Sequence, residues 1–316
     1  MASMRDIKRR KDSIQSTQQI TKAMKLVSTV KLQRARARAD NARPYFDKMY
    51  ETIQSILVTS ERLDHPYLSA GSSARKAVIV VTSNRGLAGG YNNNVTRLIT
   101  DNGWRKEDVD IYGVGRKGVE ILSRRGYSIV ADDSEMINAP SFADAASLGE
   151  RVLDAFAAGE IGEIYLAYTR FKNTVVHVPV LMKLLPVDVE PKQTAETAGG
   201  QKEDGNSAGR DGQAVSGGHP TASAGQQRKR LLMNYEPEPE EALNLLIPKY
   251  INSTIFGAFI EAAASENGAR MQAMDAATSN ADDMIATLSL VYNRARQGAI
   301  TQELTEIISG AEALDG

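Results

Sequence analysis

Residues 277–295, ATSNADDMIATLSLVYNRA, form the most informative segment of the chain. Their small and apolar side chains recur at alternating steps of four and three residues, the spacing of the contact seam of a coiled coil. The predicted seam comprises Ala277, Ala281, Met284, Leu288, Val291 and Ala295. Alanine at several of these positions allows a partner helix to approach closely. We therefore expect this segment to lie along a second long helix.

Both ends of the chain have the composition of long helices. Residues 240–309 are rich in the good helix formers Ala, Leu, Glu and Met, and would span about 100 Å as one helix. Residues 3–58 contain no glycine and one proline, Pro44, and would span about 80 Å. Ile20 and Val27 belong to the apolar stripe expected there, and Pro44 predicts a kink or a break. The two helices should pair in antiparallel fashion, with the C-terminal helix projecting beyond its mate.

The middle of the chain alternates between short strands and short helices. We expect strands at 77–82, 109–113, 128–131, 163–170 and 174–185, and helices at 115–126 and 142–158. This alternation indicates a small Rossmann-like α/β domain with a mostly parallel sheet, and the last two strands should form an antiparallel hairpin at one edge. The fold class is therefore α/β plus a long antiparallel helical coiled coil.

The predicted domains follow these changes in composition. They are an N-terminal coiled-coil helix (1–60), the central α/β domain (75–189), an insertion (190–230) and a C-terminal coiled-coil helix (235–316). The insertion is packed with Gly, Ser, Ala, Gln and Thr, so it cannot bury enough apolar surface to offset its ordering entropy. We expect it to be a flexible surface segment.

Composition excludes several kinds of site. The 316 residues contain no cysteine, which rules out disulfides, thiolate metal ligands and thiol nucleophiles. The three histidines are scattered without metal-ligand spacing, and no nucleophile–histidine–acid set is apparent. No apolar run is long enough to cross a membrane, and the charged start does not resemble a secretory signal. A soluble, intracellular protein is expected.

The positive charge gathers at one end of the chain. Residues 1–43 contain twelve lysines and arginines against three acidic residues, although the whole chain has a formal net charge of −1. Such a helix is suited to an anionic partner, and nucleic acid is one candidate. Its apolar stripe would be wasted on phosphate, however, and it lacks interleaved aromatic residues before Tyr45. An electrostatic match with the acidic remainder of the chain and a plain solvated helix face stay open as alternatives.

A second alternative is a dinucleotide-binding enzyme. Gly113, Gly115 and Gly118 match the pattern G-x-G-x-x-G between a predicted strand and a predicted helix, where a pyrophosphate can bind the helix N-terminus. Asp132 or Asp133 follows at roughly the spacing of a ribose contact. The motif follows the second strand of the domain rather than the first. A tight turn that needs glycine explains it better.

The two ends resemble a known family. Residues 7–36 (IKRRKDSIQSTQQITKAMKLVSTVKLQRAR) and 269–314 (ARMQAMDAATSNADDMIATLSLVYNRARQGAITQELTEIISGAEAL) are similar to the γ subunit of F-type ATP synthases. The loop TSNRGLAGGYN (82–92) and the segment YEPEPEEAL (235–243) also resemble that family. The similarity covers nearly the whole chain outside the low-complexity insertion. The terminal motifs are highly specific.

The resemblance implies a central rotor stalk. Its coiled coil would fill the bore of a ring of alternating α and β subunits, and its foot would rest on the c-subunit ring beside ε. Ion flow would turn the stalk, and the ATP chemistry would belong to the β subunits. No catalytic residue, metal or cofactor is then expected in this chain, and it should be held peripherally at the cytoplasmic face of a bacterial plasma membrane. The dithiol switch of chloroplast forms is excluded because cysteine is absent.

The resemblance also implies contact residues at matching positions. The contact with a loop of the β subunit comprises Arg296, Gln297, Thr301, Glu303, Met24 and Lys25. Within it, Arg296 would offer a planar donor fork to carboxylates. Arg270 occupies a position important for coupling, and Tyr235 and Glu236 occupy the foot that meets the c ring and ε. An ordinary surface salt bridge remains the alternative for each.

Overall fold

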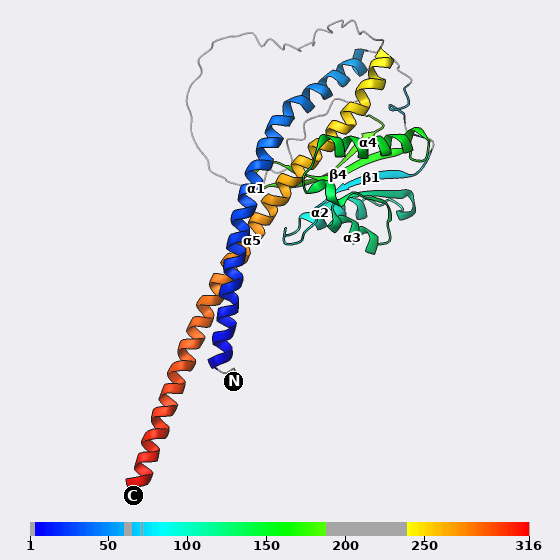
Figure 1. Ribbon diagram of the computed structural model, residues 1–316. Coiled ribbons are helices and arrows are strands. Elements are labelled where there is room, and N and C mark those ends of the chain that lie inside the picture. Colours follow the sequence, from blue (N-terminus) through cyan, green and yellow to red (C-terminus); the bar gives the residue numbers. More distant parts are fainter. Residues whose placement is uncertain (1–3, 60–64, 70, 72, 188–238, 316) are drawn as a thin grey trace, which may run out of the picture.

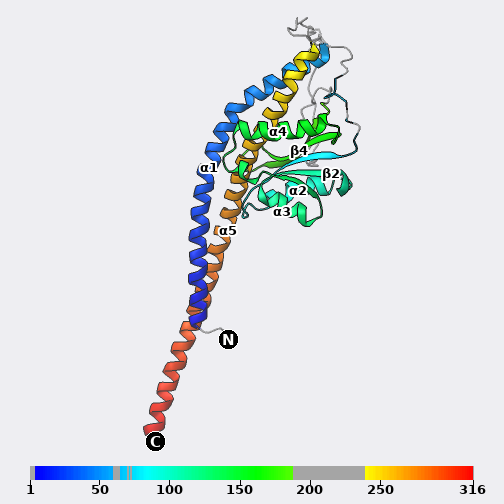
Figure 2. The same ribbon diagram turned by 45° about the vertical axis from the view of Figure 1, so that its right-hand side comes forward.

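The computed structural model describes residues 4–59, 65–69, 71, 73–187 and 239–315. Two long helices, α1 (Met4–Thr59) and α5 (Pro239–Asp315), lie side by side, and an α/β domain packs against one end of the pair (Figure 1). The N-terminus lies partway along α5, whose C-terminal end continues beyond it (Figure 2). The predicted fold class, an antiparallel coiled coil with a central α/β domain, is confirmed.

Side chains that bridge the two helices fix their register. The hydroxyls of Thr21 and Thr278 are 2.8 Å apart, and Lys25 Nζ lies 2.5 Å from Asp275 Oδ1. One turn nearer the start of α1, Gln18 donates a hydrogen bond to Asp282. Each step toward the start of α1 thus moves one step further along α5. The paired region therefore ends near the level of Arg296, and the rest of α5 projects alone (Figure 2).

The seam on α1 is more polar than the sequence suggested. Its buried and half-buried positions follow the four–three spacing: Ile7, Lys11, Ile14, Gln18, Thr21, Lys25, Ser28, Leu32 and Ala35. The stripe expected on α1 is wrong at Ile20 and Val27, whose side chains are 58% and 57% exposed, although Met24 is half-buried and Ile56 is buried as expected. Polar side chains take many of the contact positions instead, and Gln18, Thr21 and Lys25 hydrogen-bond across the seam. Ile20 and Val27 face solvent.

The predicted seam on α5 is correct in part. Ala281 is buried and Leu288 half-buried, but Met284 and Val291 are each 45% exposed. Ile285 and Tyr292, one position later, are half-buried in their place. Apolar residues in this segment are dense enough to fit two neighbouring phases, and the polar bridges to α1 select one of them.

The predicted kink or break at Pro44 is a bend without a break. Helix α1 continues through Pro44, and its second half curves away from the straight first half (Figures 1 and 2). Proline removes one backbone donor, which an otherwise stable helix can absorb by bending. Pro248 lies within α5 in the same way.

The α/β domain contains one five-stranded sheet in the order β3-β2-β1-β4-β5. Its elements are β1 (Lys76–Val81), α2 (Tyr91–Thr100), β2 (Val109–Val114), α3 (Arg116–Arg124), β3 (Ser128–Asp132), α4 (Phe142–Ala157), β4 (Glu163–Phe171) and β5 (His177–Leu185), with short 3-10 turns at Lys106–Asp108 and Ser134–Ile137. All neighbouring pairs are parallel except β4–β5, which is antiparallel as expected. Helix α2 was not predicted.

Helix α2 is not evident from its sequence, YNNNVTRLIT, because these residues are weak helix formers. Asparagine, threonine and valine all have low intrinsic helix propensity. The helix is stabilised by packing instead, since Tyr91, Val95 and Ile99 are buried against the sheet.

Alternate residues of the strands point into two hydrophobic cores, one on each face of the sheet. Val78 and Val80 point to the side covered by α2 and α3, together with Val95, Ile99 and Leu122. Ile79 and its neighbours point to the other side, where α4 and the first part of α5 pack and where Phe259 is fully buried. The domain is thus built directly onto α5 (Figure 1). The predicted insertion, 190–230, lies outside the described residues.

Candidate functional site

The projecting end of α5 carries four of the predicted contact residues. Arg296, Gln297, Thr301 and Glu303 are all exposed there. The Thr301 hydroxyl donates to the Gln297 carbonyl, a bond within the helix. No ion pair occupies the guanidinium of Arg296 in the part of the chain that the structure describes. These side chains are therefore available to a partner.

The projecting end of α5 is apolar as well as exposed. Its large apolar side chains are exposed: Ile300 47%, Leu304 54%, Ile307 67% and Ile308 58%. Residues 301–310 are exposed on every side of the helix. A helix in a protein gains most of its stability from tertiary packing of an apolar face. This face has no cover among the described residues, so it is suited to a surrounding partner.

Met24 and Lys25 do not lie beside that end. Lys25 pairs with Asp275, and Asp275 is 21 residues before Arg296 on α5, a separation of about 30 Å along the helix. The expectation that the six contact residues form one surface is therefore wrong. The polar bridges set a register that places Met24 and Lys25 near the α/β domain instead.

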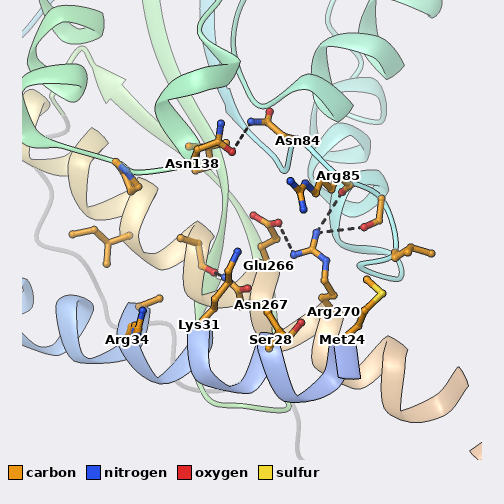
Figure 3. A pocket seen from close by; sticks show the side chains of 18 of the residues that line it. Met24, Ser28, Lys31, Arg34, Asn84, Arg85, Asn138, Glu266, Asn267 and Arg270 are labelled. Atoms are coloured by element: carbon orange, nitrogen blue, oxygen red, sulfur yellow. Dashed lines mark hydrogen bonds and ion pairs between the residues drawn. The ribbon is translucent and has the colours of Figure 1, made fainter. Parts of the chain in front are cut away.

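Met24 lines a groove between the helix pair and the α/β domain. The groove encloses about 700 Å³, and α1, α5 and the loops at 84–87 and 137–140 form its walls. Five basic side chains and one acidic one line it: Lys31, Arg34, Arg38, Arg85, Arg270 and Glu266. Figure 3 shows Arg270 reaching across it from α5, with Met24 near by. The groove is thus positively charged along its α1 side.

Arg270 is occupied within the chain. Its Nη1 lies 2.7 Å from Glu266 Oε1, one helical turn back, and both side chains are largely shielded from solvent. Its Nη2 donates to the carbonyls of Arg85 at 3.5 Å and Gly86 at 3.3 Å (Figure 3). The predicted coupling residue therefore joins α5 to the loop after β1.

The glycine-rich turn that suggested a dinucleotide is filled by the protein itself. The N–H groups that begin α3 already have partners: Arg116 N donates to Asn84 Oδ1 at 2.9 Å, and Lys117 N donates to the Ser83 carbonyl at 3.0 Å. Gly118 N donates to Thr82 Oγ1 at 2.9 Å. A bound pyrophosphate would need these same donors. The side chain of Thr82 takes that place.

The glycines have a packing role. A Cβ atom on Gly118 would lie 2.6 Å from Thr82 Oγ1, and one on Gly115 would lie 2.2 Å from the Thr82 carbonyl. Gly115 also has a φ of +119°, which side chains disfavour. The two candidate ribose acids are occupied, Asp132 by Ser134 and Asp133 by Arg151 at 2.5 Å. The turn packs strand against helix and leaves no room for a cofactor.

Other kinds of site are absent from the described ranges. In residues 4–59, 65–69, 71, 73–187 and 239–315, no three His, Asp or Glu side chains gather as metal ligands. Across the same ranges, no helix is both long and apolar enough to span a bilayer. Tyr235 and Glu236, predicted for the foot, lie outside the described residues.

Comparisons with known proteins agree with the resemblance. The family model described as ATP synthase matches residues 3–314. The ATP synthase gamma chain of Lachnoclostridium phytofermentans is 61% identical over 315 residues, which cover 100% of both chains. The chain belongs to the ATP synthase gamma family. The sodium ion specific gamma chain of Acetobacterium woodii is 40% identical over 99% of both chains.

Solved structures support the gamma-family fold. A chain of the Euglena gracilis mitochondrial ATP synthase matches with a TM-score of 0.62 at 19% identity, over 98% of this chain and 94% of that one. A chain from the central stalk and c ring of the Tetrahymena thermophila enzyme matches with a TM-score of 0.52 at 23% identity, over 82% and 99%. The predicted family is confirmed, and nothing supports the dinucleotide-enzyme alternative.

Some features of the structure had no signal in the sequence. Leu87 has a φ of +64° and is 63% exposed at the tip of the loop after β1, where Arg270 bonds to the backbone. Gln272 bonds to the carbonyls of Thr174 and Val175 in the β4–β5 hairpin. Backbone carbonyls accept hydrogen bonds whatever their side chain, so no residue pattern reveals them. Only the fold shows these contacts.

Proposed function

We propose that this gamma-family chain is the rotating central shaft of its ATP synthase. The observation that carries the proposal is the end of α5 that projects beyond α1 (Figure 2) and has exposed apolar and hydrogen-bonding side chains on all sides. A shaft that turns inside a sleeve must present a contact surface around its whole circumference. A helix that served only to pack in this chain would be covered on one face.

The helix pair has the dimensions of a shaft. The 77 residues of α5 extend over about 115 Å at 1.5 Å per residue, while a helix with its side chains is only about 10–12 Å wide. Pairing with α1 resists bending and twisting without making the rod broad. The α/β domain at the other end provides a wider body through which the rod can be driven (Figure 1).

The proposed partners follow from this arrangement. The α and β subunits of a catalytic ring surround the helix pair and its projecting end. The c-subunit ring and ε meet the opposite end, where Tyr235 and Glu236 belong to the foot. ATP is made or hydrolysed in the β subunits, so this chain is non-catalytic and binds no cofactor. The complex holds it at the cytoplasmic face of a bacterial plasma membrane.

Contact residues differ in role along the shaft. Arg296 and Gln297, with Thr301 and Glu303, bind a loop of a catalytic subunit, and Arg296 offers its donor fork to carboxylates there. Met24, which lines the basic groove, and Lys25 beside it form a second contact region about 30 Å away. Contacts of this polar, exposed kind are individually weak. They can be broken and remade at each step of a turn.

The test replaces Arg296 and Gln297 together with alanine in the reconstituted complex. The double variant loses one charge-assisted hydrogen bond and one hydrogen bond from a side-chain amide. The number of ions pumped per ATP should fall by about tenfold, which corresponds to the free energy of such hydrogen bonds. ATP hydrolysis and proton or sodium pumping are measured on the same vesicles. The control is Arg36→Ala, which removes an exposed arginine from its pair with Asp40. Unchanged pumping per ATP in the double variant would refute the assigned contact.

A further inference from the structure

One short stretch of α5 carries a concentrated set of bonds to the α/β domain. Tyr91 Oη donates to the Ala262 carbonyl at 3.2 Å, and Ser265 Oγ donates to the Thr169 carbonyl at 3.1 Å. Arg270 and Gln272 follow within two turns and reach out to the domain's loops. All of these contacts join a side chain of one part to the backbone of the other. The domain is therefore held to this stretch by direction-dependent bonds as well as by apolar burial.

Arg270 and Gln272 hold two different loops. Arg270 donates to the carbonyls of Arg85 and Gly86 in the loop between β1 and α2 (Figure 3). Gln272 Nε2 donates to the carbonyls of Thr174 and Val175, each at 3.1 Å, in the β4–β5 hairpin. Residues two apart on a helix point to nearly opposite sides, about 200° around the axis. The two loops therefore hold α5 from two sides.

Gly268 completes the arrangement. A Cβ atom there would lie 2.4 Å from His177 Nε2, so the ring at the start of β5 sits directly on the helix backbone. Gly268 itself is buried. The ion pair between Arg270 and Glu266, whose side chains are 12% and 16% exposed, holds the guanidinium in line with its carbonyl acceptors. Close contact on one side and bonds on both sides leave α5 little freedom to turn within the domain.

We propose that Gly268, Arg270 and Gln272 form a rotational brace that stops α5 from turning inside the α/β domain. The hydrophobic effect that buries this part of α5 is non-directional, whereas bonds to two loops on opposite sides oppose rotation in either sense. Twist applied to the domain thus passes into the shaft without slipping. This inference rests on the proposed shaft function. The three residues position the domain and need no contact with a partner subunit.

The first experiment uses the full chain with Arg270→Met and Gln272→Met combined. Methionine keeps length and flexibility but donates no hydrogen bond. Backbone hydrogen exchange is measured in residues 85–91 and 173–177, and we expect it to be about tenfold faster in both loops, as loss of about 1.4 kcal/mol of local protection requires. The control is Arg105→Met, which removes the exposed ion pair between Arg105 and Glu107 elsewhere in the domain. Unchanged exchange in the two loops would overturn the brace.

The second experiment uses the reconstituted complex. With the brace removed, ATP hydrolysis should continue at the native rate while ions pumped per ATP fall at least twofold, because the domain slips on the shaft. Gln272→Met alone is the milder variant, since it removes the bonds to one of the two loops only; it should show a smaller fall. Faster exchange with full pumping would overturn the role in transmission. A native complex that hydrolyses ATP without pumping would instead count against the shaft proposal, and the exchange result would still stand.

Discussion

The two ends of α5 have similar helical sequences and opposite surroundings. Between Leu243 and Met274 the helix packs against β4, α4 and α1, and residues such as Ile255 and Phe259 are completely buried. From Arg296 onward it has no neighbour in the described chain, and Leu304 and Ile307 are more than half exposed. The first part contributes to the stability of this chain. The second part can contribute only through a partner.

This contrast separates two uses of apolar surface in one helix. Burial of a large side chain contributes about 1.5–3 kcal/mol to folding, but an exposed one contributes almost nothing until something covers it. A chain that keeps four large apolar residues bare at the end of a rod carries a binding surface there. Stability and function are thus divided along the helix axis.

The largest expected effect comes from the buried end. Phe259→Ala should lower the free energy of unfolding of the isolated chain by about 3–5 kcal/mol, because it removes a ring with no exposed surface from a closed core. Leu304→Ala, at the bare end, should change it by less than about 0.5 kcal/mol. Denaturant unfolding of the two variants measures both values. Equal losses would show that the bare end is covered in the free chain, contrary to the comparison.

Strong acid should weaken the α/β domain through Glu163. Burial raises the pKa of Glu163, but hydrogen bonds and charges from Lys76 and Lys183 outweigh burial and lower that pKa to about 2. The folded pKa lies below the ordinary value of 4.5, so this stabilisation is fully present above about pH 4.5 and is lost as the pH falls toward 2. It is worth about 2 kcal/mol after allowance for partial solvent screening.

The Glu163→Gln variant checks this assignment. It should lose about 2 kcal/mol of stability at pH 7 and show a flatter fall in stability between pH 5 and 2 than the native chain. Near-ultraviolet circular dichroism, which reports Trp104 beside Tyr165 in the domain, follows the change. The exposed pair of Lys25 and Asp275 on the shaft serves as comparison, and Asp275→Asn should leave the profile almost unaltered. A native profile in Glu163→Gln would refute the assignment.

The smallest effect concerns the polar seam. Thr21 and Thr278 hydrogen-bond across the helix pair. Replacing both with valine exchanges a bonded polar pair for an apolar pair of similar shape, which should be neutral or raise stability by about 1 kcal/mol. Thr21→Val alone removes the bond across the helix pair while the Thr278 hydroxyl keeps its bond to the Met274 carbonyl, so it should lower stability by less than about 1 kcal/mol. Thermal unfolding shows whether each variant is more stable or less stable than the native chain. A double variant less stable than the single one would show that the pair stabilises the rod.

The sequence was informative wherever a repeating pattern carried the structure. The long helices, their pairing and the parallel sheet all follow from residue spacing, because each element must bury one face. Spacing failed at the seam, since Gln18, Thr21 and Ser28 are polar and an apolar count passes over them. It failed again at α2, whose residues form a helix only through packing on the sheet.

The candidate site was predictable only in part. The resemblance supplied Arg270, but its bonds to Glu266 and to two carbonyls depend on how a loop folds back onto the helix. The bonds of Gln272 likewise depend on how the β4–β5 hairpin folds back onto the helix. Met24 and Lys25 were grouped with Arg296 although the helix register places them about 30 Å away. Register depends on side-chain pairs between distant segments, and no single segment contains that information.

The most direct test of the shaft is observation of rotation. The catalytic ring of the complex is fixed to a surface, a probe is attached to this chain at an exposed position of the α/β domain such as Val130, and ATP is added. We expect the probe to turn continuously in one direction, with pauses that lengthen as the ATP concentration falls. A probe that stays still while the same complexes hydrolyse ATP would contradict the account.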